Sequence, residues 1–89
     1  MKAVITVTGK DNIGIISRVS ALCAEYGANI LEISQSVLQE YFAMIMLVDI
    51  DRLNIPFTTF VDRIHEDGVA ADLEIQAMHE DIFNSMHRI

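Results

Sequence analysis

Cysteine and basic residues are both scarce in this sequence of 89 residues. Its single cysteine, Cys23, excludes an internal disulfide bond and a metal cluster held by cysteines. Only 6 lysine and arginine residues stand against 13 acidic residues, and the net charge is −7. Because this charge repels phosphate groups, we expect neither nucleic acid nor an anionic membrane to be a partner.

Long apolar runs and a secretion signal are also missing from the sequence. No stretch of apolar residues is long enough to cross a bilayer, and the first residues lack the pattern of a signal peptide. We therefore expect a cytoplasmic protein. Hydrophobic residues still make up 52% of the chain, which excludes a disordered polypeptide and suggests that part of the surface contacts a partner.

The order of the predicted elements indicates a single small α+β domain. Alternating or continuous apolar residues predict strands over residues 2–8, 29–39, 42–48 and 71–78. Apolar residues three or four positions apart predict helices over residues 14–26 and 56–68, the second with Pro56 in its first turn and Gly68 at its end. The resulting β-α-β-β-α-β order is typical of the ferredoxin-like fold. In that fold a four-stranded antiparallel sheet has its first and third strands at the centre and both helices on one face.

Two apolar segments exceed what these two helices can cover. The strand over residues 42–48 is apolar on both faces, so we expect it to be covered on both faces. The last residues, 79–89, repeat a helical pattern that is too short to persist unless it docks, with the apolar side chains Ile82, Phe83, Met86 and Ile89. Either this tail or a second copy of the chain must shield the second sheet face. We therefore predict a homodimer.

The segment GKDNIGII, residues 9–16, connects the first predicted strand to the first predicted helix. A helix that begins after such a polar turn leaves its first backbone N–H groups unpaired, and the helix dipole adds partial positive charge there. Such a place suits a carboxylate or a phosphate group. The alternative is structural: the two glycines allow a tight turn, and Asp11 or Asn12 caps the helix.

Other chemistry-bearing residues favour a structural role. Cys23 lies on the apolar stripe of the first predicted helix, where we expect a buried thiol rather than a nucleophile. Two of the three histidines, His79 and His87, are about 12 Å apart along a helix and cannot share one ion. We therefore predict no metal and no cofactor, although a site that uses Glu80 or a second chain stays open as an alternative.

Enzymatic activity is also not expected, because no nucleophile and base stand together in the sequence. Three other functions of this topology lack their requirements. An RNA-binding sheet needs exposed aromatic and basic side chains, and a copper carrier needs paired thiolates. A small acyl phosphatase carries an arginine in its phosphate loop, and the segment over residues 9–16 has none.

Two motifs resemble those of the ACT domain, the small regulatory module of amino-acid metabolism. The first motif comprises Asp11, Asn12, Ile13, Gly14 and Ile15, with Ile13 where many members have proline. The second motif opens the second strand with Gly27, Ala28, Asn29 and Ile30. The resemblance covers about residues 1–78 and leaves residues 79–89 as a C-terminal amphipathic helical extension. The whole chain is similar to the small stand-alone ACT proteins of prokaryotes, which in turn resemble the regulators of the glycine cleavage system.

This resemblance implies a regulatory protein that pairs with a second copy and binds an effector, usually an amino acid, between the copies. One wall of the site would consist of Asp11, Asn12 and the backbone of Ile13, Gly14 and Ile15, and the other of Asn29 and Ile30. The helix N-terminus offers donors to a carboxylate, and Asp11 and Asn29 offer acceptors to an ammonium group. The alternative is an interaction module that binds a partner protein without a small ligand.

Overall fold

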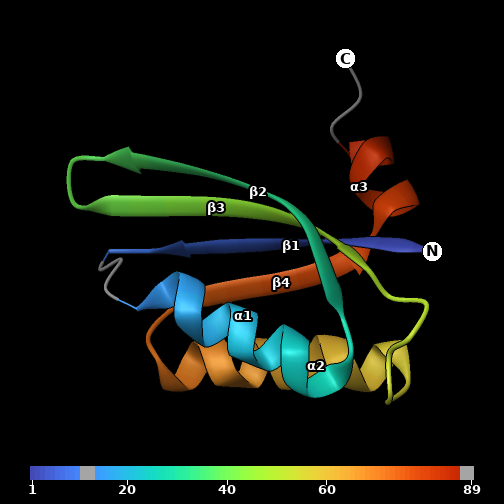
Figure 1. Cartoon of the computed structure of the whole chain (residues 1–89). Coiled ribbons are helices and arrows are strands. Elements are labelled where there is room, and N and C mark those ends of the chain that lie inside the picture. The colour runs from blue at the N-terminus through green and yellow to red at the C-terminus, as the bar shows by residue number, and fades with distance from the viewer. Residues whose placement is uncertain (11–13, 87–89) are drawn as a thin grey trace.

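The chain folds into a four-stranded antiparallel sheet with helices packed on it (Figure 1). The computed structural model describes residues 1–10 and 14–86. The elements along the chain are β1 (Lys2–Gly9), α1 (Ile15–Tyr26), β2 (Asn29–Leu38), β3 (Tyr41–Asp49), α2 (Phe57–Ala70), β4 (Glu74–His79) and α3 (Glu80–Met86). The strand order is β2-β3-β1-β4, with β1 and β3 at the centre, which confirms the predicted ferredoxin-like topology.

The hydrophobic core lies between one face of the sheet and the two longer helices. Both α1 and α2 lie beneath this face in Figure 1. Alternate residues of a strand point to the same face, and residues paired across strands share that face. Ile5 of β1 is paired with Met46 of β3 and with Ala77 of β4, and all three are buried. The helices contribute Ile15, Val19 and Cys23 from α1, and Phe60 and Ile64 from α2.

The opposite side of the sheet is only partly covered. This open face includes Val4, Thr6 and Thr8 of β1, Glu32, Ser34, Ser36 and Leu38 of β2, Tyr41, Ala43, Ile45 and Leu47 of β3, and Glu74, Gln76 and Met78 of β4. The short helix α3 rises on this side (Figure 1) and packs against β1 and β4.

Covering of the open face is limited to one end. Val4 is only 4% exposed, whereas Ile45, in the middle of β3, is 46% exposed. The helix α3 has seven residues, or about 10 Å, and reaches no further. The described residues of a single chain therefore cover the third strand fully on the helix side and only in part on the open face, and cover from a second copy stays a prediction.

The end of α2 differs from the prediction. Gly68, which was expected to end the helix, is buried inside it, and α2 continues to Ala70. The N–H group of Leu73 donates to the carbonyl oxygen of Gly68 at 2.7 Å. Asp72 adopts the left-handed conformation, with φ of 60°, that is usual for a glycine at a helix end. As a result β4 begins at Glu74 rather than at residue 71.

Two further boundaries are corrected. Pro56 does not lie in the first turn of α2 but precedes the helix in an extended conformation, and its carbonyl oxygen accepts the N–H group of Phe60 at 3.0 Å. His79 belongs to β4 rather than to the predicted C-terminal helix. That helix, α3, ends at Met86, and residues 87–89 lie outside the described residues. None of the helices in the described part of the chain has the length and apolar character that a membrane crossing requires.

Candidate functional site

The turn before α1 is the ligand site that the sequence predicts. Gly14 precedes the helix with φ of 73°, a left-handed conformation that favours glycine. The N–H group of Arg18 donates to the Gly14 carbonyl oxygen at 2.9 Å and closes the first helical turn. The N–H groups of Ile15, Ile16 and Ser17 have no partner within the helix, as at the start of any helix, and Gly14 has no side chain that could cap them. The motif residues Asp11, Asn12 and Ile13 lie outside the described residues.

The second predicted wall lies at the opposite end of α1. This helix has 12 residues and is about 18 Å long. Gly27 ends it in a left-handed conformation, with φ of 82°, and β2 begins two residues later at Asn29. The side chain of Asn29 is exposed, whereas Ile30 is half-buried against the core. Within one chain, therefore, the structure does not bring Asn29 and Ile30 close to Gly14 and Ile15.

The edge strand β2 carries apolar side chains that a single chain leaves partly exposed. Leu31, Ile33 and Val37 are between 40% and 60% exposed. Leu31 lies at a bulge, where the pairing of β2 with β3 shifts by one residue. Ile33 and Val37 point to the side of the sheet that the helices cover, because they pair with the buried Met46 and Phe42. The helices do not extend far enough to cover this edge.

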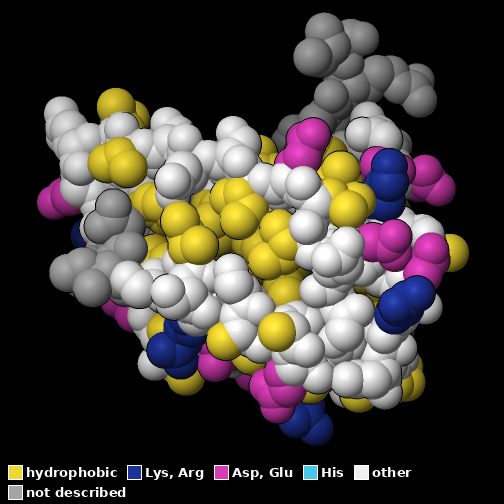
Figure 2. Space-filling model, viewed as in Figure 1, with side chains coloured by type: hydrophobic (Ala, Val, Ile, Leu, Met, Phe, Trp, Pro, Cys, Tyr) yellow, Lys and Arg dark blue, Asp and Glu magenta, His cyan; other side chains and the backbone are white. Residues whose placement is uncertain are grey.

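One flank of α1 continues this apolar surface. Arg18 donates from Nε to Asp67 of α2 at 2.7 Å, so the opposite flank of α1, which carries Ile16, faces β2. Ile16 is 38% exposed. We call the four side chains Ile16, Leu31, Ile33 and Val37 the edge patch. Figure 2 shows apolar side chains gathered in a hollow between β2 and α1.

The thiol and the histidines have structural surroundings. Cys23 is buried, as predicted, and burial raises the pKa of its thiol to about 11. His65 Nδ1 lies 3.3 Å from the carbonyl oxygen of Ile75, and the ring of His79 lies 4.4 Å from that of Phe57. Within residues 1–10 and 14–86, no three metal-binding side chains form a group. His87 lies outside the described residues.

Comparisons with known proteins identify the family. The family model of the ACT domain matches residues 2–82. A UPF0237 protein of Clostridium acetobutylicum is 47% identical over 89 residues and covers all of both chains. The structure of an ACT domain protein from Streptococcus pneumoniae has a TM-score of 0.82 and 41% identity, and covers 98% of each chain. A putative glycine cleavage system transcriptional repressor has a TM-score of 0.69 and 26% identity, over 86% of this chain and 44% of that one. This chain therefore belongs to the ACT domain family.

Proposed function

We propose that this chain is a regulatory ACT domain without enzymatic activity, which binds an amino acid between two copies of itself. The observation that carries the proposal is the position of the two predicted walls, with Gly14 at one end of α1 and Asn29 at the other. A single chain cannot place both walls on one small ligand, because the length of α1, about 18 Å, separates them. A second copy related by two-fold symmetry removes this difficulty.

Antiparallel pairing of β2 with its counterpart in the second copy would join the two walls. In such a pair the start of one strand lies beside the end of the other. The end of β2 and the start of α1 lie at the same end of the molecule (Figure 1). Asn29 of the second copy would therefore lie beside the end of β2, close to the N-terminus of α1.

The surface of β2 is suited to pairing with itself. The strand has ten residues, of which only Glu32 is charged. It has none of the lysine or proline residues that usually protect an exposed edge. The second half of the chain, residues 46–89, holds nine of the 13 acidic residues, so the β2 side meets the least repulsion from a second copy. The edge patch would add apolar contact area next to the paired strands.

The chemistry of the two walls matches a free amino acid. The N–H groups at the start of α1, which have no partner within the helix, would bind the carboxylate, and the side-chain oxygens of Asp11 and Asn29 would accept hydrogen bonds from the ammonium group. A regulatory role is supported by the name of the similar repressor. Absence of catalysis is supported by the contacts of the two described histidines, because His65 lies against the carbonyl oxygen of Ile75 and His79 against the ring of Phe57.

Thermal unfolding with each of the common amino acids tests the proposal. A ligand present at about 100 times its Kd adds about 2.7 kcal/mol to the free energy of unfolding. Calorimetry on the best ligand should then show about 10- to 150-fold weaker binding for Asp11→Ala, because a charge-assisted hydrogen bond is lost. Asn29→Ala should weaken binding by less, and Asn84→Ala, an exposed control on α3, should leave it unchanged.

Two results would contradict this assignment. If Asp11→Ala and Asn29→Ala both bind the ligand as tightly as wild type, the two residues do not form the ligand site. If Asp11→Ala then also has a lower melting point, the role of Asp11 is to cap the helix. A dimer that no amino acid stabilises would favour the interaction module that needs no small ligand.

A further inference from the structure

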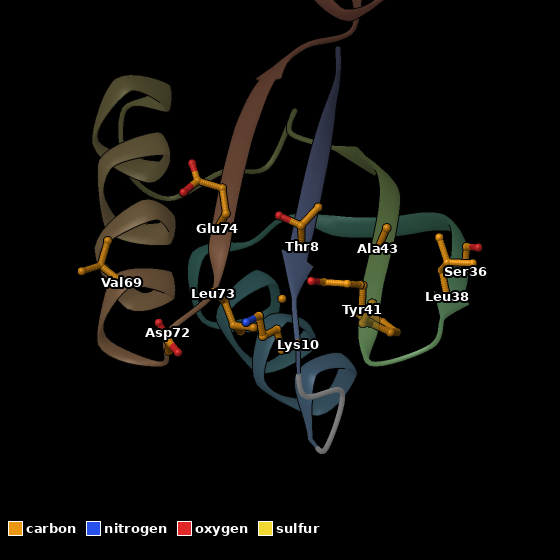
Figure 3. A pocket seen from close by; sticks show the side chains of 12 residues that line it. Thr8, Lys10, Ser36, Leu38, Tyr41, Ala43, Val69, Asp72, Leu73 and Glu74 are labelled. Carbon is orange, nitrogen blue, oxygen red and sulfur yellow. The ribbon is translucent and has the colours of Figure 1, made fainter.

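A groove of about 930 Å³ lies at the end of the open face, near the turn between β2 and β3. Its lining includes Thr8, Lys10, Leu38, Tyr41, Asp72 and Glu74. Figure 3 shows Lys10 between Leu73 and Tyr41, and Thr8 and Ala43 on neighbouring strands. The volume falls within the range of small-molecule sites in proteins.

The groove exists because one row of the sheet carries small side chains. Ser36, Ala43 and Thr8 are paired across β2, β3 and β1, and Glu74 of β4 completes the row. Neighbouring strands are about 4.8 Å apart, so this row of four residues spans about 14 Å. The next pair along the hairpin, Leu38 with Tyr41, is large and forms an apolar wall. Leu38 is 72% exposed and Tyr41 is 50% exposed, which leaves both side chains available to a ligand.

Charges of both signs line the groove in separate places. The amino group of Lys10 lies 5.9 Å from the centre of the Tyr41 ring, within the range of a cation–π contact. Glu74 is oriented by Gln76, whose Nε2 donates to the Glu74 carboxylate at 3.0 Å. The ion pairs that the structure has within residues 1–10 and 14–86 do not join Lys10 to Asp72 or Glu74. Lys10 therefore stands apart from the two carboxylates among the described residues, so a ligand with charges of both signs can contact both.

This distribution of charge selects the class of ligand. One cation and two carboxylates give the groove a net negative charge, in a chain whose own charge is −7, so a simple anion is disfavoured. A simple cation meets repulsion from Lys10. A molecule that carries both charges satisfies both sets of groups, and an apolar body on the same molecule fits against Leu38 and Tyr41.

We propose that this groove binds a small zwitterion with an apolar side chain, of the size of leucine or phenylalanine. Its carboxylate lies at Lys10, its ammonium group lies towards Asp72 and Glu74, and its side chain packs on Tyr41. The groove shares the end of β2 with the dimer proposed above but opens on another face of the sheet. It opens on the open face of the sheet, whereas α1 lies against the opposite face (Figure 1).

Titration followed by amide NMR, with ligands that differ in one charged group, tests this assignment. L-Leucine and L-phenylalanine should shift the amide signals of Thr8, Ala43 and Glu74. L-Leucinamide, which lacks the carboxylate, and N-acetyl-L-leucine, which lacks the ammonium group, should bind about tenfold more weakly or not at all. Shifts confined to α1 and Asn29 would place the amino acid only at the site proposed above and would overturn the groove assignment.

Substitutions in the groove supply the second arm of the test. Lys10→Met and Glu74→Gln should each weaken binding about tenfold. Lys2→Met, at the start of β1, and Glu32→Gln, on β2, remove the same charges elsewhere and should leave binding unchanged. Ala43→Leu fills the small-residue row and should abolish binding; because Ala43 is exposed, the melting point should change little. Wild-type affinity in both Lys10→Met and Ala43→Leu would overturn the proposal. The absence of any amide shift with each of these ligands at about 20 mM would overturn it as well.

Discussion

Gly68 of α2 lies directly against Ile75 of β4. A Cβ atom at position 68 would stand 2.8 Å from Ile75 Cγ1 and 2.9 Å from the carbonyl oxygen of Leu73. The absent side chain is therefore what allows the helix to approach the strand so closely. Because Leu73 is contacted through its backbone, a larger residue at position 68 must move the chain and not merely a side chain.

Gly68→Ala is expected to destabilise the protein. Overpacking typically costs about 1–3 kcal/mol, and the better helix propensity of alanine returns at most about 1 kcal/mol. We expect the free energy of unfolding to fall by about 1–2 kcal/mol in urea titrations. Val69→Ala changes the next residue, which is 64% exposed, and should lie within about 0.5 kcal/mol of wild type. A Gly68→Ala variant as stable as wild type would show that α2 and β4 separate without loss.

The error at Gly68 shows where the sequence is ambiguous. A glycine in a helical pattern marks either the end of the helix or a close approach to another element, and both leave the same letter in the sequence. Only the position of Ile75, which the fold decides, separates the two. The end of α1 at Tyr26 was predicted correctly because the apolar stripe of the helix stops there and a new alternation begins at Asn29.

The candidate site could be predicted only in part. The position of Gly14 before a helix follows from local chemistry, and in the structure Gly14 does lie immediately before α1. The distance between Gly14 and Asn29 depends on the length and direction of α1, which the spacing of two motifs does not contain. The groove at Lys10 depends on the register of four strands, which places Ser36, Ala43 and Thr8 in one row. No single segment of the sequence carries that information.

The thiol of Cys23 should react slowly in the folded protein. Burial raises its pKa to about 11, so at pH 8 about 0.1% of it is thiolate. A thiol with an ordinary pKa near 8.5 to 9 would be roughly a hundred times more ionised. We therefore expect alkylation by iodoacetamide at pH 8 to be at least about a hundredfold slower in buffer than in guanidinium chloride. Equal rates under both conditions would contradict the buried position.

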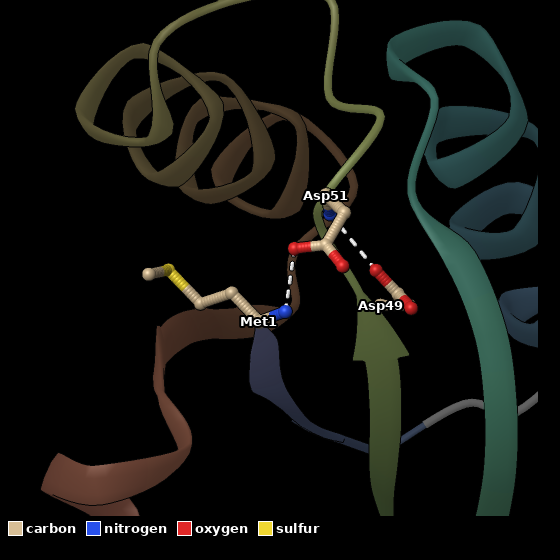
Figure 4. Close-up of polar contacts among 3 residues, drawn as sticks. All are labelled: Met1, Asp49 and Asp51. Carbon is tan, nitrogen blue, oxygen red and sulfur yellow. Dashed lines mark hydrogen bonds and ion pairs between the residues drawn. The ribbon is translucent and has the colours of Figure 1, made fainter.

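The N-terminal ammonium group of Met1 bonds to the carboxylate of Asp51 (Figure 4). The N–H group of Asp51 in turn donates to Asp49 at 2.8 Å. The hydrogen bond with Asp51 raises the pKa of the N-terminal amine, and the nearby charge of Asp51 adds to the rise. The raised pKa decides how the ion pair depends on pH. The ion pair is fully present below the pKa of the amine in the unfolded chain, about 8, and is lost as the pH rises through the higher pKa of the folded protein.

Asp51→Asn should lower the pKa of the N-terminal amine. An amine-reactive acylating reagent measures this pKa, because its rate of reaction rises with the fraction of neutral amine. The rate profile of Asp51→Asn should move to lower pH, whereas that of Asp81→Asn, an acidic residue on α3, should match wild type. The melting point should change little, because the Met1 and Asp51 side chains are 66% and 62% exposed. An unchanged rate profile in Asp51→Asn would show that the pair does not persist in solution.

Two variants test whether the copies of the proposed dimer meet at β2. Val37 in the edge patch and Val69 on α2 are 60% and 64% exposed, so a lysine at either position should leave the fold intact. Val37→Lys would place one charge from each copy at the paired β2 strands and remove apolar contact from both. A buried valine is worth about 1.5–3 kcal/mol, so two of them imply at least a hundredfold weaker dimer.

Light scattering at protein concentrations from about 1 µM to about 100 µM distinguishes the outcomes. We expect wild type and Val69→Lys to be dimers and Val37→Lys to be a monomer with a melting point close to that of Val69→Lys. If Val69→Lys dissociates and Val37→Lys does not, the copies meet at α2 rather than at β2. In that case the partner's Asn29 cannot reach the N-terminus of α1, and the two walls of the amino acid site remain about 18 Å apart.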